Sequence, residues 1–122
     1  MNLTSIRLLT TDVDRLTAFY ELITGVTAQR PAPVFAQIAT PGATLAIGAT
    51  ATMPFLDTAA LPAGPAIVEF QVDDVDAEFA RLREDLTDVV LEPATMPWGN
   101  RSLVVRDPDG NLVNLFTPPV AG

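Results

Sequence analysis

One short pattern occurs twice in this chain at a constant spacing. The first copy is SIRLLTTDVD at residues 5–14, and the second is IVEFQVDDVD at residues 67–76. Aligning the two aspartates gives an offset of 74 − 12 = 62, and the same offset carries Arg30-Pro31 onto Glu92-Pro93. Repetition at a fixed spacing predicts two copies of one supersecondary unit, because a single copy cannot bury its apolar face alone.

The first copy reads as one strand, one helix and three further strands. Leu16, Phe19, Tyr20 and Ile23 are apolar at helical spacing, which predicts a helix over 13–24 capped by Thr11 or Asp12. Gly25 is a typical residue to end it. Alternation and Pro/Gly breaks predict strands over 3–10, 26–30, 34–40 and 44–48.

The second copy repeats this order. Its strongest local signal is Asp107-Pro108-Asp109-Gly110, a tight turn between two strands. The pattern predicts strands over 66–72, 88–92, 101–106 and 111–116, and a helix over about 75–86.

The expected fold is therefore α+β. Two tandem βαβββ modules form a curled, half-open mixed β-sheet barrel with the helices outside. At 122 residues the chain fits a single domain. Module one covers about 1–50, a linker rich in Ala, Thr and Pro covers about 51–64, and module two covers about 65–122.

Composition excludes several kinds of chemistry. The chain has no Cys, His or Lys, which rules out disulfides, thiol nucleophiles, Ser-His-Asp triads and lysine Schiff bases. The net charge of −8 repels phosphate backbones, so nucleic acid is not an expected partner. No stretch is long and apolar enough to span a membrane, and the N-terminus does not read as a signal peptide. We therefore expect a cytoplasmic protein.

Four segments carry a resemblance to a known family. They are 11–20, 72–76, the stretch PWGNR at 97–101 and the tail RDPDGNLVNLF at 106–116. In these segments the chain resembles the vicinal oxygen chelate superfamily, which includes glyoxalase I, the bleomycin-resistance proteins and the extradiol dioxygenases. The resemblance covers nearly the whole chain and implies the same two-module fold. It also implies a homodimer, since small curled sheets leave exposed edges.

The resemblance implies where a metal would be held. Metal-dependent members place a ligand seven residues before the Asp of each strand-to-helix turn, and here 12 − 7 = 5 and 74 − 7 = 67 give Ser5 and Ile67. A third ligand, a Glu, lies four residues after the Gly of the DPDG turn, and 110 + 4 gives Asn114. The fourth position lies near Ala46. These side chains are poor ligands for Zn, Ni, Fe or Mn, so we expect no metal and no other cofactor. An all-oxygen Mg²⁺ or Ca²⁺ site built from the many Asp residues stays open.

Strand alternation places the candidate ligand-binding residues. Ser5, Arg7 and Leu9 share the face that family metal ligands occupy, and Ile67 and Glu69 share it in the second module. Arg7 and Glu69 are equivalent, since 7 + 62 = 69. We therefore expect an ion pair between them on the cavity floor, with solvent exposure of either residue as the alternative.

Four further residues complete the candidate set. Trp98 supplies an aromatic wall for a ligand, or else closes the open end of the sheet. Arg101 binds an anionic ligand group, or else braces Asp107 or Asp109. Asn114 is a hydrogen-bonding group in the cavity, or else a satisfied polar residue, and Phe116 shares its face.

The favoured function is a metal-free binding protein that sequesters a small apolar or aromatic ligand. An acidic chain suits a cationic ligand. The first alternative is a glyoxalase-like lyase or dioxygenase relative, or an enzyme that uses Glu69 or Glu92 without a metal. The second alternative is a non-catalytic interaction module. No residue is assigned a catalytic role.

Overall fold

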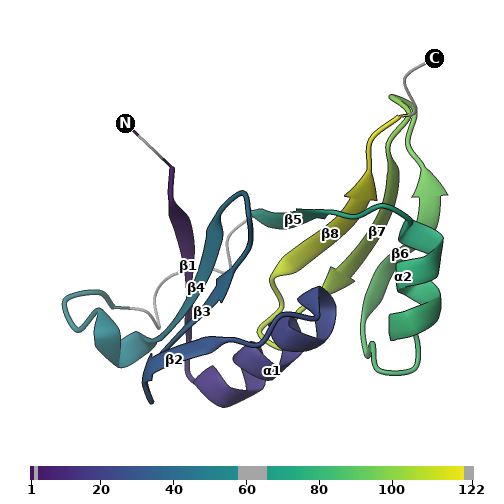
Figure 1. Ribbon diagram of the computed structural model, residues 1–122. Coiled ribbons are helices and arrows are strands. Elements are labelled where there is room, and N and C mark those ends of the chain that lie inside the picture. The colour runs from purple at the N-terminus through teal and green to yellow at the C-terminus, as the bar shows by residue number, and fades with distance from the viewer. Residues whose placement is uncertain (2, 58–65, 120–122) are drawn as a thin grey trace. The chain divides into compact units, whose positions relative to one another are not determined.

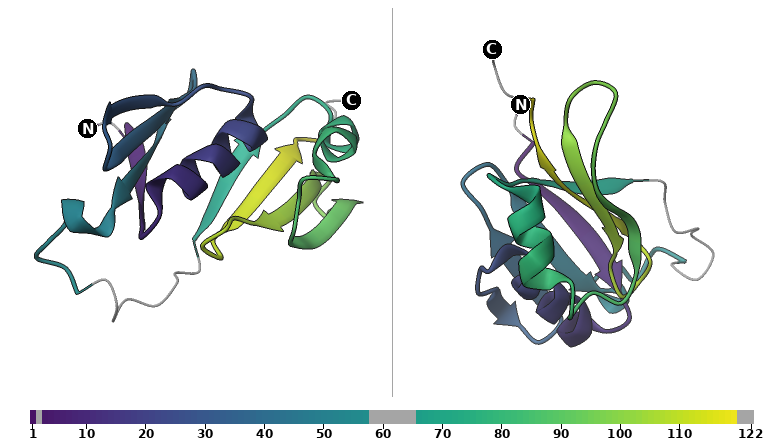
Figure 2. Two further views of the ribbon diagram at one scale, coloured as in Figure 1. Left: turned by 90° about the horizontal axis from the view of Figure 1, so that it is seen from below. Right: turned by 90° about the vertical axis from the view of Figure 1, so that its right-hand side faces the viewer.

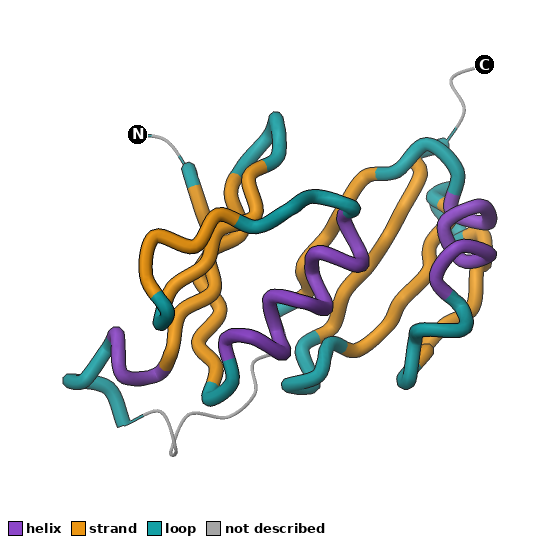
Figure 3. Tube along the Cα trace, turned by 60° about the horizontal axis from the view of Figure 1, so that its bottom comes forward, coloured by secondary structure: helices purple, strands orange, loops and turns teal. Residues whose placement is uncertain are grey.

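The computed structural model describes residue 1, residues 3–57 and residues 66–119. The chain divides into two compact units, Met1–Pro62 and Ala63–Gly122. In its described part, each unit contains one α-helix and one four-stranded sheet (Figure 1). The residues drawn in grey in Figure 3 are outside this description.

The first unit follows the predicted order of strand, helix and three strands. Its sheet has the order β1-β4-β3-β2, in which β1 pairs with β4 in parallel and the other pairs are antiparallel. A 3₁₀ turn, η1 (Thr50–Thr52), follows the last strand. The elements are β1 (Ser5–Thr10), α1 (Val13–Thr24), β2 (Gln29–Ala32), β3 (Phe35–Ala39) and β4 (Thr44–Ala49).

Helix α1 has the predicted bounds because both ends are capped. The Asp12 side chain accepts a hydrogen bond from the Arg15 backbone N–H at 3.0 Å. Gly25 takes the left-handed conformation, with φ of 69°, and its N–H bonds to the Glu21 carbonyl at 2.8 Å. The buried side of α1 packs on β3 and β4. The unit's core consists of Val13, Leu16, Tyr20, Ile23, Ala36, Ile38, Leu45, Ala46 and Ile47.

The second unit repeats this arrangement. Its sheet has the order β5-β8-β7-β6, with β5 parallel to β8 and the remaining pairs antiparallel. Helix α2 packs on β6, β7 and β8 (Figure 2, right). The elements are β5 (Ile67–Gln71), α2 (Val75–Leu82), β6 (Val89–Thr95), β7 (Arg101–Arg106) and β8 (Leu112–Thr117).

Helix α2 is shorter than predicted. It starts where expected, with the Asp74 side chain accepting from the Ala77 N–H at 3.0 Å. It ends at Leu82, whereas the sequence pattern predicted about residue 86. Residues 83–85 are exposed and charged, so continuing the helix there buries no apolar surface. The chain turns instead, with the Asp85 N–H bonded to the Leu82 carbonyl at 2.9 Å.

The β7–β8 connection confirms the predicted tight turn. The buried Asp107 carboxylate accepts hydrogen bonds from the backbone N–H groups of Asp109 and Asn111, both at 2.9 Å, and from Asn111 Nδ2 at 2.8 Å. Gly110 has φ of 90°, a conformation that favours glycine. The turn is therefore fixed by one side chain and one backbone conformation.

Two strands are displaced from their predicted bounds. Strand β2 begins at Gln29, and residues 26–28 are held by α1 instead: Thr24 Oγ1 accepts from the Val26 N–H at 3.1 Å, and Glu21 Oε2 accepts from the Ala28 N–H at 2.8 Å. Strand β6 runs on to Thr95, with register irregularities against β7.

The predicted α+β class and the two βαβββ modules are confirmed. The half-open barrel concerns how the two units sit together and stays a prediction. Neither helix of the described chain is long and apolar enough to cross a membrane.

Candidate functional site

Seven of the nine predicted ligand-binding residues lie on the sheet faces opposite the helices. In β1 the side chains of Ile6, Leu8 and Thr10 alternate with the predicted set, and Thr10 is buried. In β8, Val113 and Leu115 are buried in the core, so their neighbours in the strand point to the other face. The residues on these opposite faces are Ser5, Arg7 and Leu9 in the first unit, and Ile67, Glu69, Asn114 and Phe116 in the second.

The sheet register repeats between the units. Arg7 lies opposite Ala46 in the β1–β4 pair, and Glu69 lies opposite Asn114 in the β5–β8 pair. Ala46 and Asn114 are thus structural equivalents, as the resemblance implied. The duplication extends from the sequence to the pairing of individual residues.

The residues at the four implied metal positions do not fit a transition metal. They offer a hydroxyl from Ser5, a methyl from Ala46, a branched alkyl chain from Ile67 and an amide from Asn114. Among the described residues, no group of three or more His, Cys, Asp and Glu side chains could hold a metal ion.

On the first unit, Arg7 lies against an aromatic ring. Its guanidinium carbon is 5.2 Å from the centre of the Phe35 ring, and Nη1 is 3.5 Å from Met53 Sδ. Gly48 lies next to both groups: a Cβ there would make ordinary contact with Arg7 Cδ at 3.5 Å and with Phe35 Cδ2 at 3.6 Å. The candidate set omitted Phe35 and Met53. Alternation in 34–40 places Phe35 on this face, whereas no sequence signal indicates Met53.

On the second unit, Glu69 and Asn114 form a side-chain pair. Asn114 Nδ2 donates to Glu69 Oε2 at 2.9 Å. Asn114 Oδ1 is shielded from solvent and has no hydrogen-bond partner within the described residues. Ile67 is 49% exposed on the same face, next to this polar pair. The expected Arg7–Glu69 ion pair would join the two units and stays a prediction.

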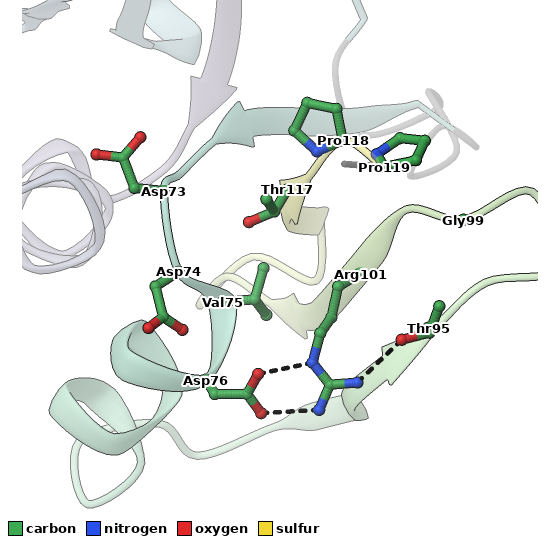
Figure 4. A pocket seen from close by; sticks show the side chains of 10 residues that line it. All are labelled: Asp73, Asp74, Val75, Asp76, Thr95, Gly99, Arg101, Thr117, Pro118 and Pro119. Atoms are coloured by element: carbon green, nitrogen blue, oxygen red, sulfur yellow. Dashed lines mark hydrogen bonds and ion pairs between the residues drawn. The ribbon is translucent and has the colours of Figure 1, made fainter. Parts of the chain in front are cut away.

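Arg101 lies on the helix side of its sheet, away from Glu69 and Asn114. It shares this side with the buried residues Leu103 and Val105. Its Nε and Nη2 donate to the two carboxylate oxygens of Asp76 at 2.6 and 2.8 Å, and Nη1 donates to Thr95 Oγ1 at 3.2 Å (Figure 4). Arg101 therefore braces Asp76 of α2, and its contact with an anionic ligand group stays a prediction.

The partner of Arg101 differs from the two that the sequence suggested. Asp107 and Asp109 follow the far end of β7, about 20 Å along the strand from Arg101, whereas Asp76 is in the first turn of α2. The hydrogen bond from Arg101 lowers the pKa of Asp76, and the same bond raises the pKa of Arg101. Both side chains are partly exposed, so solvent weakens their attraction.

A surface pocket of about 280 Å³ lies beside this ion pair, within the second unit. Asp73, Asp74 and the Asp76–Arg101 pair line one side, and Pro118 and Pro119 line the other (Figure 4). Of the nine predicted residues, the pocket contains Arg101 alone. It is therefore separate from the sheet face that carries Glu69 and Asn114.

Trp98 occupies the turn between β6 and β7 and is 67% exposed. The turn is held by hydrogen bonds from the Met96 N–H to the Asn100 carbonyl and from the Gly99 N–H to the Met96 carbonyl. Gly99 has φ of 102°, and a Cβ there would lie 2.9 Å from Pro119 Cβ. Trp98 is thus presented on a closely packed turn. Its contact with a ligand stays a prediction.

Comparisons with known proteins agree with this fold. The model of the Glyoxalase/Bleomycin resistance protein/Dioxygenase superfamily matches residues 2–115. A comparison with curated proteins gives no match.

Three solved structures illustrate the similarity. A glyoxalase/bleomycin resistance protein/dioxygenase from Nocardioides is 25% identical, with a TM-score of 0.80 over 100% of this chain and 86% of that one. TioX from Micromonospora sp. ML1 is 26% identical, with a TM-score of 0.76 over 96% and 98%. A lactoylglutathione lyase from Agrobacterium tumefaciens is 21% identical, with a TM-score of 0.76 over 95% and 92%, and shows likeness of fold alone.

Proposed function

Because the chain belongs to the glyoxalase/bleomycin resistance protein/dioxygenase superfamily, we propose that it is a metal-free binding protein of the bleomycin-resistance kind. It sequesters a small apolar or aromatic molecule, including cationic ones, on the sheet faces opposite its helices. One observation carries the proposal. Where the family resemblance implies a metal ligand, Asn114 instead donates a hydrogen bond to Glu69.

The composition of these faces supports binding of an organic ligand. Ligand sites are mostly apolar, with a few polar groups that fix orientation. Ile67 and Phe116 supply apolar surface on the second unit, and Phe35 supplies it on the first. Arg7 and the Glu69–Asn114 pair are the polar groups. The net charge of −8 draws cations at long range, which favours a cationic aromatic ligand.

The proposal also covers the oligomeric state and the location of the protein. The protein acts as a homodimer, since β1 and β5 are edge strands in their sheets. It acts in the cytoplasm, which the absence of cysteine suits.

The test is a binding panel read by melting temperature and Trp98 fluorescence. The panel contains 2-naphthylmethylammonium, neutral 2-naphthamide, the divalent ions Zn²⁺, Ni²⁺ and Mn²⁺, and a 2-oxoaldehyde–thiol adduct. We expect the naphthyl compounds to raise the melting temperature and the metal ions to leave it unchanged. Ligand that binds only the native state stabilises it by mass action.

Two matched variants locate the binding face. Phe116→Ala removes an aromatic ring from the sheet face opposite α2, and we expect it to weaken naphthamide binding. Phe79→Ala removes a ring of similar partial exposure from α2, on the other side of the sheet, and should leave binding unchanged. Equal effects of the two substitutions would show that the binding face is elsewhere.

The other two functions give different results in the same panel. Stabilisation by a transition metal, with turnover of the adduct, would identify a metal-dependent lyase and overturn the proposal. Failure of every compound to bind would favour a non-catalytic interaction module.

A further inference from the structure

The strongest unused feature of the molecule is the guanidinium group of Arg7. It is exposed, and it has neighbours within its own unit: the Phe35 ring centre lies 5.2 Å from its carbon, Met53 Sδ lies 3.5 Å from Nη1 and Gly48 lies next to Cδ. A planar guanidinium carries five N–H donors in a rigid fork. Within the described chain, the sulfur atom is the one hydrogen-bond acceptor that Arg7 contacts.

Among the described residues of its own unit, Arg7 has no carboxylate partner, although the chain is acidic. The sequence has 15 acidic residues and 7 arginines, so carboxylates outnumber guanidinium groups about two to one. Arg7 nevertheless makes no ion pair among the described residues of the first unit, and its partner there is an aromatic ring. The arginines with a carboxylate partner include those in the pairs Arg30–Asp14, Arg81–Glu78, Arg101–Asp76 and Arg106–Asp88.

We propose that Arg7 recognises the carboxylate of an aromatic ligand. The guanidinium over the Phe35 ring presents its fork of N–H donors to the carboxylate, which accepts two parallel N–H···O bonds. The Phe35 ring holds the fork and adds apolar surface beside it. This inference rests on the proposed binding function and adds a negatively charged group to the ligand class. Arg7 selects that group at contact distance, whereas the net charge acts at long range.

Two probes of one shape test the inference. 2-Naphthoate carries the carboxylate, and 2-naphthamide replaces it with a neutral group of similar size. Dissociation constants are measured by calorimetry, and the Arg7 Nε–Hε resonance is followed by NMR in ¹⁵N-labelled protein. We expect 2-naphthoate to bind about 10- to 100-fold more tightly than 2-naphthamide, as for a charge-assisted pair of hydrogen bonds. It should also shift the Arg7 resonance.

Variants separate the fork geometry from simple charge. Arg7→Gln should remove the difference in affinity between the two probes, so that 2-naphthoate binds no more tightly than 2-naphthamide. Arg7→Lys keeps the charge without the fork and should recover only part of the difference. The matched control is Arg83→Gln, because the Arg83 guanidinium also lies over an aromatic ring, 5.6 Å from the centre of Phe79, but beside α2. This control should bind both probes as the wild type does.

Each result has a distinct meaning. The role of Arg7 would be overturned if the wild type bound the two probes with equal affinity. It would also be overturned if Arg83→Gln lost as much 2-naphthoate affinity as Arg7→Gln. Either result would leave the proposed binding function standing. Binding of neither probe would overturn this inference, and if 2-naphthylmethylammonium did not bind either, the proposed function would fall with it. A third result is that the wild type binds 2-naphthoate and 2-naphthamide equally, whereas Glu69→Gln binds 2-naphthoate more tightly. Arg7 would then be paired with Glu69, and the inference would be wrong.

Discussion

At the scale of single residues, two polar atoms stand out for lacking partners. Thr17 Oγ1 and Asn114 Oδ1 are buried and make no hydrogen bond within the described chain. A buried polar atom without a partner costs free energy, so each such atom calls for a reason. Asn114 lies on the sheet face opposite α2, which we propose for ligand binding. Thr17 lies on the buried side of α1, where no functional role is assigned to it.

Thr17→Val should therefore stabilise the protein. The substitution keeps the branched shape and removes the unpartnered hydroxyl, and the two residues have similar helix propensity. We expect the free energy of unfolding to rise by about 1 kcal/mol, measured by urea denaturation. The control Thr17→Ser keeps the hydroxyl and loses the methyl group, and should be less stable than the wild type. A less stable Thr17→Val protein would show that the hydroxyl is hydrogen-bonded.

At the scale of elements, the β7–β8 turn depends on one carboxylate. Asp107 accepts three hydrogen bonds, two of them from backbone N–H groups. Asp107→Ala leaves these donors without their acceptor, and we expect a loss of about 1–3 kcal/mol in the free energy of unfolding. Asp107→Asn retains one acceptor oxygen and should lose less. Urea denaturation of both variants checks the order, and an Asn variant as unstable as the Ala variant would contradict it.

The ion pair between Asp76 of α2 and Arg101 of β7 predicts an acid-dependent change. Arg101 lowers the pKa of Asp76, so the ionised form is favoured in the folded state. The resulting stabilisation is fully present above the unfolded value, about pH 3.9, and is lost as the pH falls through the lower folded pKa. Between pH 7 and pH 2, the melting temperature of the wild type should fall further than that of Asp76→Asn.

Asp73→Asn is the control for this experiment. Asp73 lines the same pocket but points away from Arg101 (Figure 4). Its variant should keep the acid dependence of the wild type. If Asp73→Asn lost the acid dependence and Asp76→Asn kept it, Asp73 and not Asp76 would be its source. Because the pair is exposed, 1 M salt should reduce the difference between the wild type and Asp76→Asn.

At the scale of the whole molecule, charge is the property that the entire chain determines. The net charge of −8 predicts that 2-naphthylmethylammonium binds more weakly as salt rises from 20 to 500 mM, because screening removes the long-range attraction. Binding of neutral 2-naphthamide should change little. Calorimetry at the two salt concentrations checks both. Equal salt dependence for the two compounds would remove the argument for a cationic ligand.

The sequence alone determined the architecture of each unit. The repeat at 62 residues predicted two βαβββ modules, and both were found. The predicted ends of α1 and the predicted β7–β8 turn were confirmed because both depend on contacts between residues close in sequence. Asp12 and Gly25 cap α1, and Asp107 and Gly110 close the turn. The unsuitable residues at the implied metal positions were also readable, since ligand chemistry depends on residue identity.

Only the tertiary structure decided which side chains meet. Arg101 pairs with Asp76, 25 residues away, and Arg7 contacts Met53, 46 residues away. No periodicity or motif encodes such contacts, because they depend on how the strands are registered and where the helix starts. The same holds for the beginning of β2, which Glu21 and Thr24 of α1 delay by binding residues 26–28. Pattern determines elements through short-range hydrogen bonds and apolar spacing, whereas the candidate site forms from contacts that exist only after the sheets have assembled.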